Sequence, residues 1–330
     1  MTLRQTILAA AVSAAVATPA LAVELDKPKA YGYLSAGALK IESNDAEAQA
    51  FELEIGLQGK AVIEDGLNLH YALEVDLAPA ANDADHRSPG GESELHVKEA
   101  KFWLPTKYGI FVAAPRGTSG HWVELYGPIN HYEYNEPHAE LNPDGIFAQP
   151  DRTSGTFAYH TPKFMNTKLV AAAITLYNDN GQDADGRSVR IVYDDGRLGM
   201  GIGTTMLMQE QLPPFATDDY LISVASAQYR IGGLSLGAVW ERNDDSPYPF
   251  APEGKADFDA YGVSASYVAD SGMGIALGYK EKDHDFDAAD ENVYTLKVEQ
   301  RITPRVKVWA ETGQYDVLPS NYAVGFNLTF

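Results

Sequence analysis

The end of the chain carries the clearest pattern of apolar and polar positions. Over residues 321–330, large apolar side chains hold every second position, with alanine, glycine, asparagine or threonine between them. The apolar positions are Tyr322, Val324, Phe326, Leu328 and Phe330. A period of two residues predicts a β-strand with one apolar and one polar face. A strand of a soluble β-sandwich has the same period, so the rest of the chain must decide between these classes.

The alternation recurs along the whole chain and predicts about sixteen strands. Each segment has about ten residues, the length that a tilted strand needs to cross a bilayer. The predicted strands are 29–41, 48–60, 66–77, 92–104, 107–116, 152–161, 167–177, 186–195, 197–209, 218–230, 233–242, 257–269, 272–282, 291–302, 304–313 and 321–330.

The connections between these segments alternate strictly between short and long. The short ones are Ala61–Asp65, Pro105–Thr106, Pro162–Asn166, Gly196, Ile231–Gly232, Asp270–Ser271 and Thr303. The long ones are 43–47, 78–91, 117–151, 178–185, 210–217, 243–256, 283–290 and 314–320. This sorting predicts an all-β, antiparallel, up-and-down transmembrane barrel with one rim in the periplasm and the other outside the cell. A Greek-key sandwich has no reason to sort its loops in this way.

The phase of the alternation predicts which side chains face lipid. Backbone polar groups within lipid must be paired inside the protein, so strands survive there only in a closed barrel with its apolar faces outward. A barrel of about sixteen strands holds a water-filled lumen. The segment Tyr108–Arg116 is apolar on both faces, and we expect it to lie against another subunit. The residues predicted to face lipid in two clear segments are Phe51, Leu53, Ile55 and Leu57, and Leu67, Leu69, Tyr71, Leu73 and Val75.

The start of the chain predicts export. Residues 1–22 combine Arg4, a short apolar run and a small-residue cleavage site, as in a cleaved secretory signal peptide. Residues 23–330 then form a single barrel domain. The formal net charge is -21, and removal of the signal peptide with its one arginine makes it -22. Such an acidic chain is not expected to bind nucleic acid. The chain has no cysteine, which excludes disulfides and thiolate metal sites.

One connection is far longer than the others. Residues 117–151 form a stretch of about 35 residues, and its aromatic content favours packing over disorder. We expect this connection to fold into the wide lumen and narrow it. Its aromatic residues are Trp122, Tyr126, Tyr132, Tyr134 and Phe147.

Three stretches resemble the general (trimeric) porin family of Gram-negative bacteria. The terminal strand ends on an aromatic residue. Residues 98–104, Lys-Glu-Ala-Lys-Phe-Trp-Leu, with Tyr108-Gly and Arg116 after them, are similar to the family's Arg-Glu-Ala-Tyr-Val-Gly-Leu, then Phe-Gly and Gly-Arg. Residues 152–164 are similar to its Arg-x-x-Asn-Ser-Val-x-Tyr-x-Ser-Pro-x-Phe. The resemblance implies a homotrimer in the outer membrane, in contact with lipid and lipopolysaccharide. It also implies that the barrel assembly machinery reads Tyr322, Phe326, Leu328 and Phe330.

In that family the third long loop folds inward, and its acids face a ladder of basic residues across the constriction. The resemblance places Lys98, Arg116 and Arg152 in the basic ladder. Glu54 stands where the family often has arginine, so we add it to the acidic side and expect a less basic constriction. The family's Pro-Glu-Phe-Gly-Gly signature is absent from the loop. The loop acids on the acidic side would be Glu124, Glu133, Glu136, Glu140 and Asp144.

We therefore expect a passive pore for small hydrophilic solutes and ions with a mild cation preference, and no enzyme. An alternative is a substrate-specific or gated channel, for example for a sugar that stacks on the loop aromatics. A remote alternative is a hydrolase barrel, because Gly233–Gly237 matches G-x-S-x-G, although no helix follows it. A soluble exported β-protein is the weakest interpretation.

No cofactor is expected. A metal site at His131, Glu133, Glu136 and His138 is less favoured than an ordinary polar loop. Acids of a predicted outer loop could hold a divalent cation against lipopolysaccharide phosphates, although a solvated loop is the simpler interpretation. These acids are Asp283, Asp285, Asp287, Asp290 and Glu291.

Overall fold

The computed structural model describes residues 24–64, 66–82, 96–136, 145–175, 185–209, 212, 216, 218–247, 255–285 and 290–330. The signal peptide predicted at 1–22 lies outside these residues. The strands are β1 (Glu24–Leu25), β2 (Lys29–Ile41), β3 (Glu47–Glu64), β4 (Leu67–Asp76), β5 (His96–Thr106), β6 (Gly109–Thr118), β7 (Arg152–His160), β8 (Thr167–Ile174), β9 (Gly186–Asp194), β10 (Leu198–Leu207), β11 (Tyr220–Ile231), β12 (Leu234–Pro247), β13 (Lys255–Val268), β14 (Met273–His284), β15 (Glu291–Thr303), β16 (Val306–Tyr315) and β17 (Asn321–Thr329). The helical segments are α2 (Ala78–Asn82) and the π-helix η1 (Trp122–Tyr126). None of the described helices is long and apolar enough to cross a membrane.

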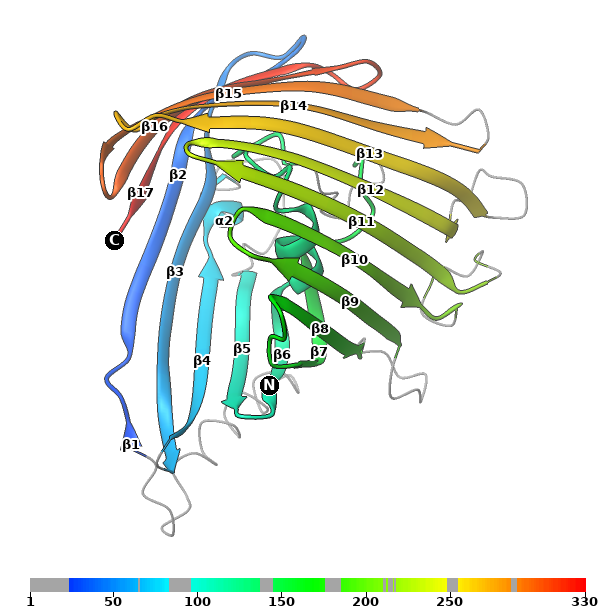
Figure 1. The fold of residues 1–330 in the computed structure, drawn as a ribbon. Helices are drawn as coiled ribbons and strands as arrows, with labels where there is room; N and C mark the ends of the chain where they lie inside the picture. The colour runs from blue at the N-terminus through cyan, green and yellow to red at the C-terminus, as the bar shows by residue number, and fades with distance from the viewer. Residues whose placement is uncertain are drawn as a thin grey trace.

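The strands form a closed antiparallel ring. Each strand from β2 to β17 pairs with its neighbours in sequence, and β17 pairs back with β2, which makes sixteen strands in the described residues (Figure 1). The short strand β1 lies beside β3 in line with β2. A closed ring has no free edge, so every strand from β2 to β17 has a backbone partner on both sides. The predicted up-and-down barrel is confirmed.

The last residue of the chain takes part in the closure. The amide of Gly32 donates to the carbonyl of Phe330 at 3.0 Å, and the amide of Phe330 donates to the carbonyl of Gly32 at 3.1 Å. The ring of Phe330 lies over Gly32, in space that a Cβ atom there would occupy. Tyr322 and Phe326 are exposed on the outer face, as their alternation predicts.

Among the side chains predicted to face lipid, three are clearly exposed and one lies on the inner side. Ile55, Leu57 and Leu73 are exposed as predicted. Phe51 was predicted beside them, and that prediction is wrong. Its ring packs edge-on against Trp309, which is only 4% exposed. A β-bulge in β3 is the physical reason, because an extra residue shifts the alternation by one position.

Two of the predicted short turns are displaced along the chain. The connection expected at Ala61–Asp65 is shorter, because β3 stays paired with β4 as far as Glu64. Pro105 and Thr106, expected to form a turn, belong to β5 and pair with β6. In both places pairing with the neighbouring strand continues through residues whose local pattern predicts a turn.

The long connection between β6 and β7 folds into the barrel, as predicted. Its described residues are 119–136 and 145–151, and η1 lies within the ring of strands (Figure 1). Trp122, Leu125, Tyr126, Ile129 and Phe147 are almost fully buried. They form one apolar cluster with side chains on the inner wall, namely Val224, Val239, Phe258, Ala260 and Val293.

Glycines on the inner wall make room for this inward loop. A Cβ atom at Gly237 of β12 would overlap the backbone carbonyl of Pro128. At Gly262 of β13 it would lie 2.7 Å from Ile129, closer than real Cβ atoms approach. Gly201, Gly203, Gly278 and Gly313 meet other loop residues in the same way. The loop can therefore approach the wall because these positions lack side chains.

Gly237→Ala is expected to push the loop away from β12. The clash is with backbone, which cannot rotate aside, so the loop should move toward β3, β4 and β5 and narrow the opening on that side. Single-channel conductance should fall, and the current should become noisier. Gly199→Ala on β10 is the matched control, because the nearest atom there is the end of the Arg230 side chain at 3.3 Å. Equal conductance in the two variants would contradict this account of the glycines.

Candidate functional site

A buried carboxylate on β12 holds one part of the inward loop. Glu241 is fully buried and accepts hydrogen bonds from the amides of Ala148 at 2.8 Å and Gln149 at 3.3 Å. The hydroxyl of Tyr126 donates to the same carboxylate. These bonds satisfy backbone donors that would otherwise be buried without a partner.

A second carboxylate, on β16, holds the next part of the loop. Glu311 accepts hydrogen bonds from the amides of three consecutive residues, Glu133 at 2.9 Å and Tyr134 and Asn135 at 2.8 Å each. The side-chain amide of Asn135 also donates to it at 3.0 Å. A carboxylate that accepts several backbone amides makes stronger hydrogen bonds than a neutral acceptor would. The course of the loop is therefore fixed by residues far away in the sequence.

Lysines on the same wall bind the carbonyl side of the loop. Lys280 of β14 is almost fully buried, and its ammonium group donates to the carbonyl of Asn135 at 2.7 Å. Lys282 donates to the carbonyl of Gly145 at 3.3 Å. Two separate parts of the inward loop are thus tied to β14.

Glu133 faces basic side chains of the wall beside the loop. Its carboxylate lies 2.7 Å from the ammonium group of Lys297 and accepts a hydrogen bond from Tyr33 at 2.9 Å. Burial alone would raise the pKa of Glu133, but the charge of Lys297 outweighs it, so this pKa lies below its ordinary value. Glu133 is therefore ionised at neutral pH.

Glu124 of η1 has basic partners on other strands. Its carboxylate contacts Lys168 of β8 and Arg190 of β9. Burial again acts to raise the pKa of Glu124, and the charge of Arg190 outweighs it, so the pKa is lowered. Glu124 lines a separate cavity of about 380 Å³ with Lys168 and Arg230.

The opposite wall carries Lys98 between two acids. Its ammonium group lies 2.7 Å from the carboxylate of Glu52 and is in direct contact with Glu54. Lys98 and Glu54 are each 9% exposed. Glu54, expected to face basic residues across the opening, instead pairs with a member of the predicted basic ladder on its own side. With two carboxyl groups next to one ammonium group, Lys98 adds no net positive charge.

Of the other predicted ladder residues, Arg152 lies next to Lys98. Arg152 donates to the backbone carbonyl of Lys98 at 3.4 Å and pairs with Asp151 at 3.1 Å. Arg116 donates to the hydroxyl of Ser154 at 3.1 Å. The structure thus brings Lys98 and Arg152 together, while Arg116 does not line the cavity described next.

A cavity of about 590 Å³ lies between the loop and the wall of β3, β4 and β5. Its lining includes Lys98, Arg152, Glu133 and Glu136 from the predicted set, and neither Glu54 nor Glu124. Glu140 and Asp144 lie outside the described residues. The ionisable lining consists of five carboxyl and three basic side chains, namely Glu52, Asp76, Glu133, Glu136, Asp151, Lys98, Arg152 and Lys280.

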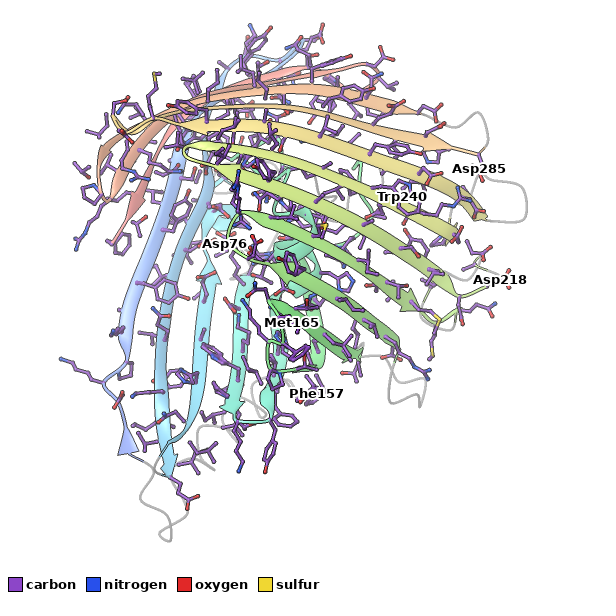
Figure 2. The ribbon with its side chains drawn as sticks, viewed as in Figure 1. Asp76, Phe157, Met165, Asp218, Trp240 and Asp285 are labelled. Carbon is purple, nitrogen blue, oxygen red and sulfur yellow. The ribbon has the colours of Figure 1, made fainter. Side chains whose placement is uncertain are left out.

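Four of these residues were absent from the predicted site. Asp76, at the end of β4 (Figure 2), caps α2 by accepting from the amide of Ala78 at 2.8 Å. Asp151 stands next to a predicted ladder residue, and Lys280 lies on a polar strand face. Glu52 had a signal in the sequence, because it lies on the predicted lumen face of its strand.

The loop aromatics serve the packing of the loop. Trp122, Tyr126, Tyr132 and Phe147 are each at most 4% exposed, and only Tyr134 among the loop aromatics lines the cavity. The buried rings therefore pack against the barrel wall, and a solute in the lumen cannot stack on them.

The other sequence candidates have different partners. Ser235 of G-x-S-x-G lies within β12 and accepts a hydrogen bond from Gln228 at 3.0 Å. His131 contacts Ser264, and no group of three ligands suited to a metal ion occurs in the described residues.

The acids of the predicted outer loop have partners within the chain. Asp285 (Figure 2) lies 3.3 Å from Arg242, as part of a group with Asp244, Asp257 and Asp259. Glu291 accepts hydrogen bonds from the amides of residues 316–318, and Asp290 from the amide of His284. Asp287 lies outside the described residues.

Comparisons with known proteins agree with this geometry. Residues 9–318 match the model of the Gram-negative porin family. No curated protein sequence matches the chain. OmpF of Salmonella typhi, solved with daunomycin, has 15% identity and a TM-score of 0.75 over 92% of this chain and 98% of its own. The anion-selective porin from Comamonas acidovorans has 13% identity and a TM-score of 0.70 over 92% and 99%. The trimer form of OmpT from Vibrio cholerae has 15% identity and a TM-score of 0.66, also over 92% and 99%.

Glu311→Gln should loosen the loop. The glutamine amide is uncharged and has one acceptor oxygen, whereas the carboxylate is charged and has two. We expect the native state to lose about 2–4 kcal/mol. The loop should become sensitive to protease in detergent, and the thermal unfolding midpoint should fall.

The matched control is Glu281→Gln on β14. This carboxylate accepts from Tyr279 at 2.9 Å and does not bind the loop. If Glu281→Gln and Glu311→Gln exposed the loop to protease equally, Glu311 would have no special role in holding it.

Proposed function

Because this chain belongs to the Gram-negative porin family, we propose that it forms an outer-membrane diffusion pore with a mild preference for cations. Family membership makes it a non-enzymatic channel of the Gram-negative outer membrane. The ion preference and the constriction residues are the new parts of the proposal. Small hydrophilic solutes would cross passively, sorted by size and by the field between the loop and the wall.

The balance of charge around the 590 Å³ cavity carries the ion preference. Five carboxyl groups and three basic groups line it, and one of the basic groups, Lys98, lies between Glu52 and Glu54. An excess of acidic groups in a narrow space with low-dielectric walls raises the local concentration of cations. The net charge of -21 for the whole chain acts in the same direction.

The constriction would consist of Glu133 and Glu136 of the loop opposite Lys98 and Arg152 of the wall. Fixed charges of both signs orient a dipolar solute and favour polar over apolar molecules. In this proposal Glu52 takes the place that the sequence had suggested for Glu54. Arg116 and Glu124 serve the wall and the anchoring of the loop.

The sign of the preference does not follow from the fold. One structure that this barrel resembles is the anion-selective porin from Comamonas acidovorans. The lining of each channel must therefore set its own preference. The alternative of a sugar-specific channel is less favoured, because most of its proposed stacking platform is buried against the wall.

A homotrimer is the proposed assembly. The structurally similar OmpT from Vibrio cholerae is described in a trimer form. Here the outer faces of β5, β6 and β7 carry the exposed rings of Phe102, Phe111 and Phe157, the last shown in Figure 2. These rings line a shallow, largely apolar groove that either lipid or another subunit can cover. Lipopolysaccharide and the barrel assembly machinery are the further proposed partners.

The ion preference is tested by the reversal potential of a planar bilayer in a potassium chloride gradient. The wild-type channel should favour potassium, and Glu136→Gln should lower the ratio of potassium to chloride permeability. One charge about 8 Å from the ion path acts with roughly 0.5 kcal/mol at the dielectric constant of water, a factor of about two. Glu281→Gln should leave the ratio unchanged, because Glu281 lies on the outer rim. A wild-type preference for chloride would overturn the proposal.

The assembly is tested by electrophoresis of protein extracted in detergent and kept unheated. We expect a species of about three times the mass of the mature chain, which is the 35.9 kDa full chain less residues 1–22, and heating should convert it to the monomer. Cross-linking before extraction should trap the same species. An unheated, folded sample that runs as a monomer and yields no cross-linked trimer would contradict a homotrimer.

A further inference from the structure

A third lumen-side cavity differs from the constriction in its chemistry. It has a volume of about 330 Å³ and lies along β5 to β9, under the start of the inward loop. Its apolar lining includes Trp103, Ile110, Val112, Ala158 and Ala172. Most of these side chains are only partly buried, so the cavity is open to the lumen.

The inward direction of these side chains follows from the strand alternation. Phe111 and Phe157 are 51% and 60% exposed on the outer face, so Ile110, Val112 and Ala158 point to the lumen. Contact with another subunit could explain only the outer apolar face of β6. Apolar side chains that face water in a channel are unfavourable, so the inner face needs another reason.

The ionisable groups of this cavity are all basic. Its lining contains Lys101, His121, His160 and Arg190, and no aspartate or glutamate. Lys101 pairs with Glu99, which lies outside the lining, and Arg190 pairs likewise with Glu124. Glu124 is shared between Arg190 and Lys168, so this group of three basic and two acidic side chains keeps one positive charge, which favours an anion.

His121 adds an unused polar atom to the same lining. Its Nδ1 atom lies 2.9 Å from the hydroxyl of Ser188, and its Nε2 atom has no hydrogen-bond partner within the described residues. Burial and the nearby charge of Arg190 lower the pKa of His121 to about 3, so the ring is neutral. Buried polar atoms without partners are rare in native proteins.

The geometry points to a binding site for a small carboxylate with an aromatic or branched apolar body. The body would lie against Trp103, Ile110 and Val112, and the carboxylate would lie near the ammonium group of Lys101. That group is 5.6 Å from the centre of the Trp103 ring, so one ligand can reach both. The volume of about 330 Å³ lies within the range of small-molecule sites. This inference rests on the proposed pore and names a solute class for it.

The site would complement the cation preference of the constriction. An anion meets an excess of acids at the first cavity, which slows its passage. A nearby basic and apolar site offers the same anion a favourable position, provided that it has an apolar body. Chloride would gain little there, whereas an aromatic carboxylate would bind.

Benzoate is the probe, with benzylamine and benzamide as cationic and neutral analogues of similar shape. Benzoate added to wild-type channels should lower the potassium chloride conductance saturably, in roughly the millimolar range that weak small-ligand binding implies. The two analogues should have little effect. Val112→Glu, which places a carboxylate in the cavity, should weaken the block at least about tenfold.

Gln228→Glu is the matched control. It adds the same charge to another lumen-side cavity on β11, and its block by benzoate should stay within about twofold of wild type. Benzoate binding to the purified protein in detergent, measured by equilibrium dialysis, tests the site without any current. If the protein bound benzoate in detergent but produced no conductance in a bilayer, the proposed pore would be wrong and the proposed binding site would still hold. Absence of binding, equal effects of benzoate and benzylamine, or an unchanged block in Val112→Glu would overturn the site.

Discussion

Everything in this molecule depends on the rule that no backbone hydrogen-bonding group is left unpaired in lipid. The sixteen strands satisfy it by pairing in a ring, and a ring of that width leaves a lumen that side chains from the wall do not fill. A related rule applies to the loop that enters the lumen, because its backbone amides are buried against the wall and away from water. Its amides are satisfied by Glu241 and Glu311, two acids that the wall holds in place for this purpose. The barrel and its constriction thus follow from one requirement.

The sequence predicts the barrel well because strands that face lipid on one side and water on the other have a strict period of two. The terminal strand and the loop sorting follow from this pattern, and the inward course of the long connection follows from its length and its aromatic content. Phe51 is a position where the period of two gives the wrong face of the strand. A bulge adds one residue to a strand without changing the local composition. The sequence alone therefore gives no sign that the two faces of the strand exchange at that position. The misplaced turns at Ala61–Asp65 and Pro105–Thr106 have a related cause, since pairing with a neighbour overrode the local signals.

The constriction is less predictable, because its members come from strands far apart in the sequence. Glu54 and Lys98 look like opposing members of the two sides, yet the ring places β3 and β5 close enough for them to pair. The glycines are a second example. Gly201 and Gly203 lie within β10, and Gly237 ends the G-x-S-x-G stretch, whose strand context argues against a hydrolase without suggesting another role. Only the path of the loop shows that each leaves space for a particular loop residue.

The pairing of Phe330 with Gly32 has a consequence for how the protein is made. The two residues that complete the ring are among the last and the first of the barrel to leave the ribosome. Contacts between such distant segments form slowly. Until β17 is available, β2 has no partner on one side. An incomplete polypeptide would therefore keep two edge strands with unpaired backbone groups. A chain that lacks its last strand therefore cannot close the ring.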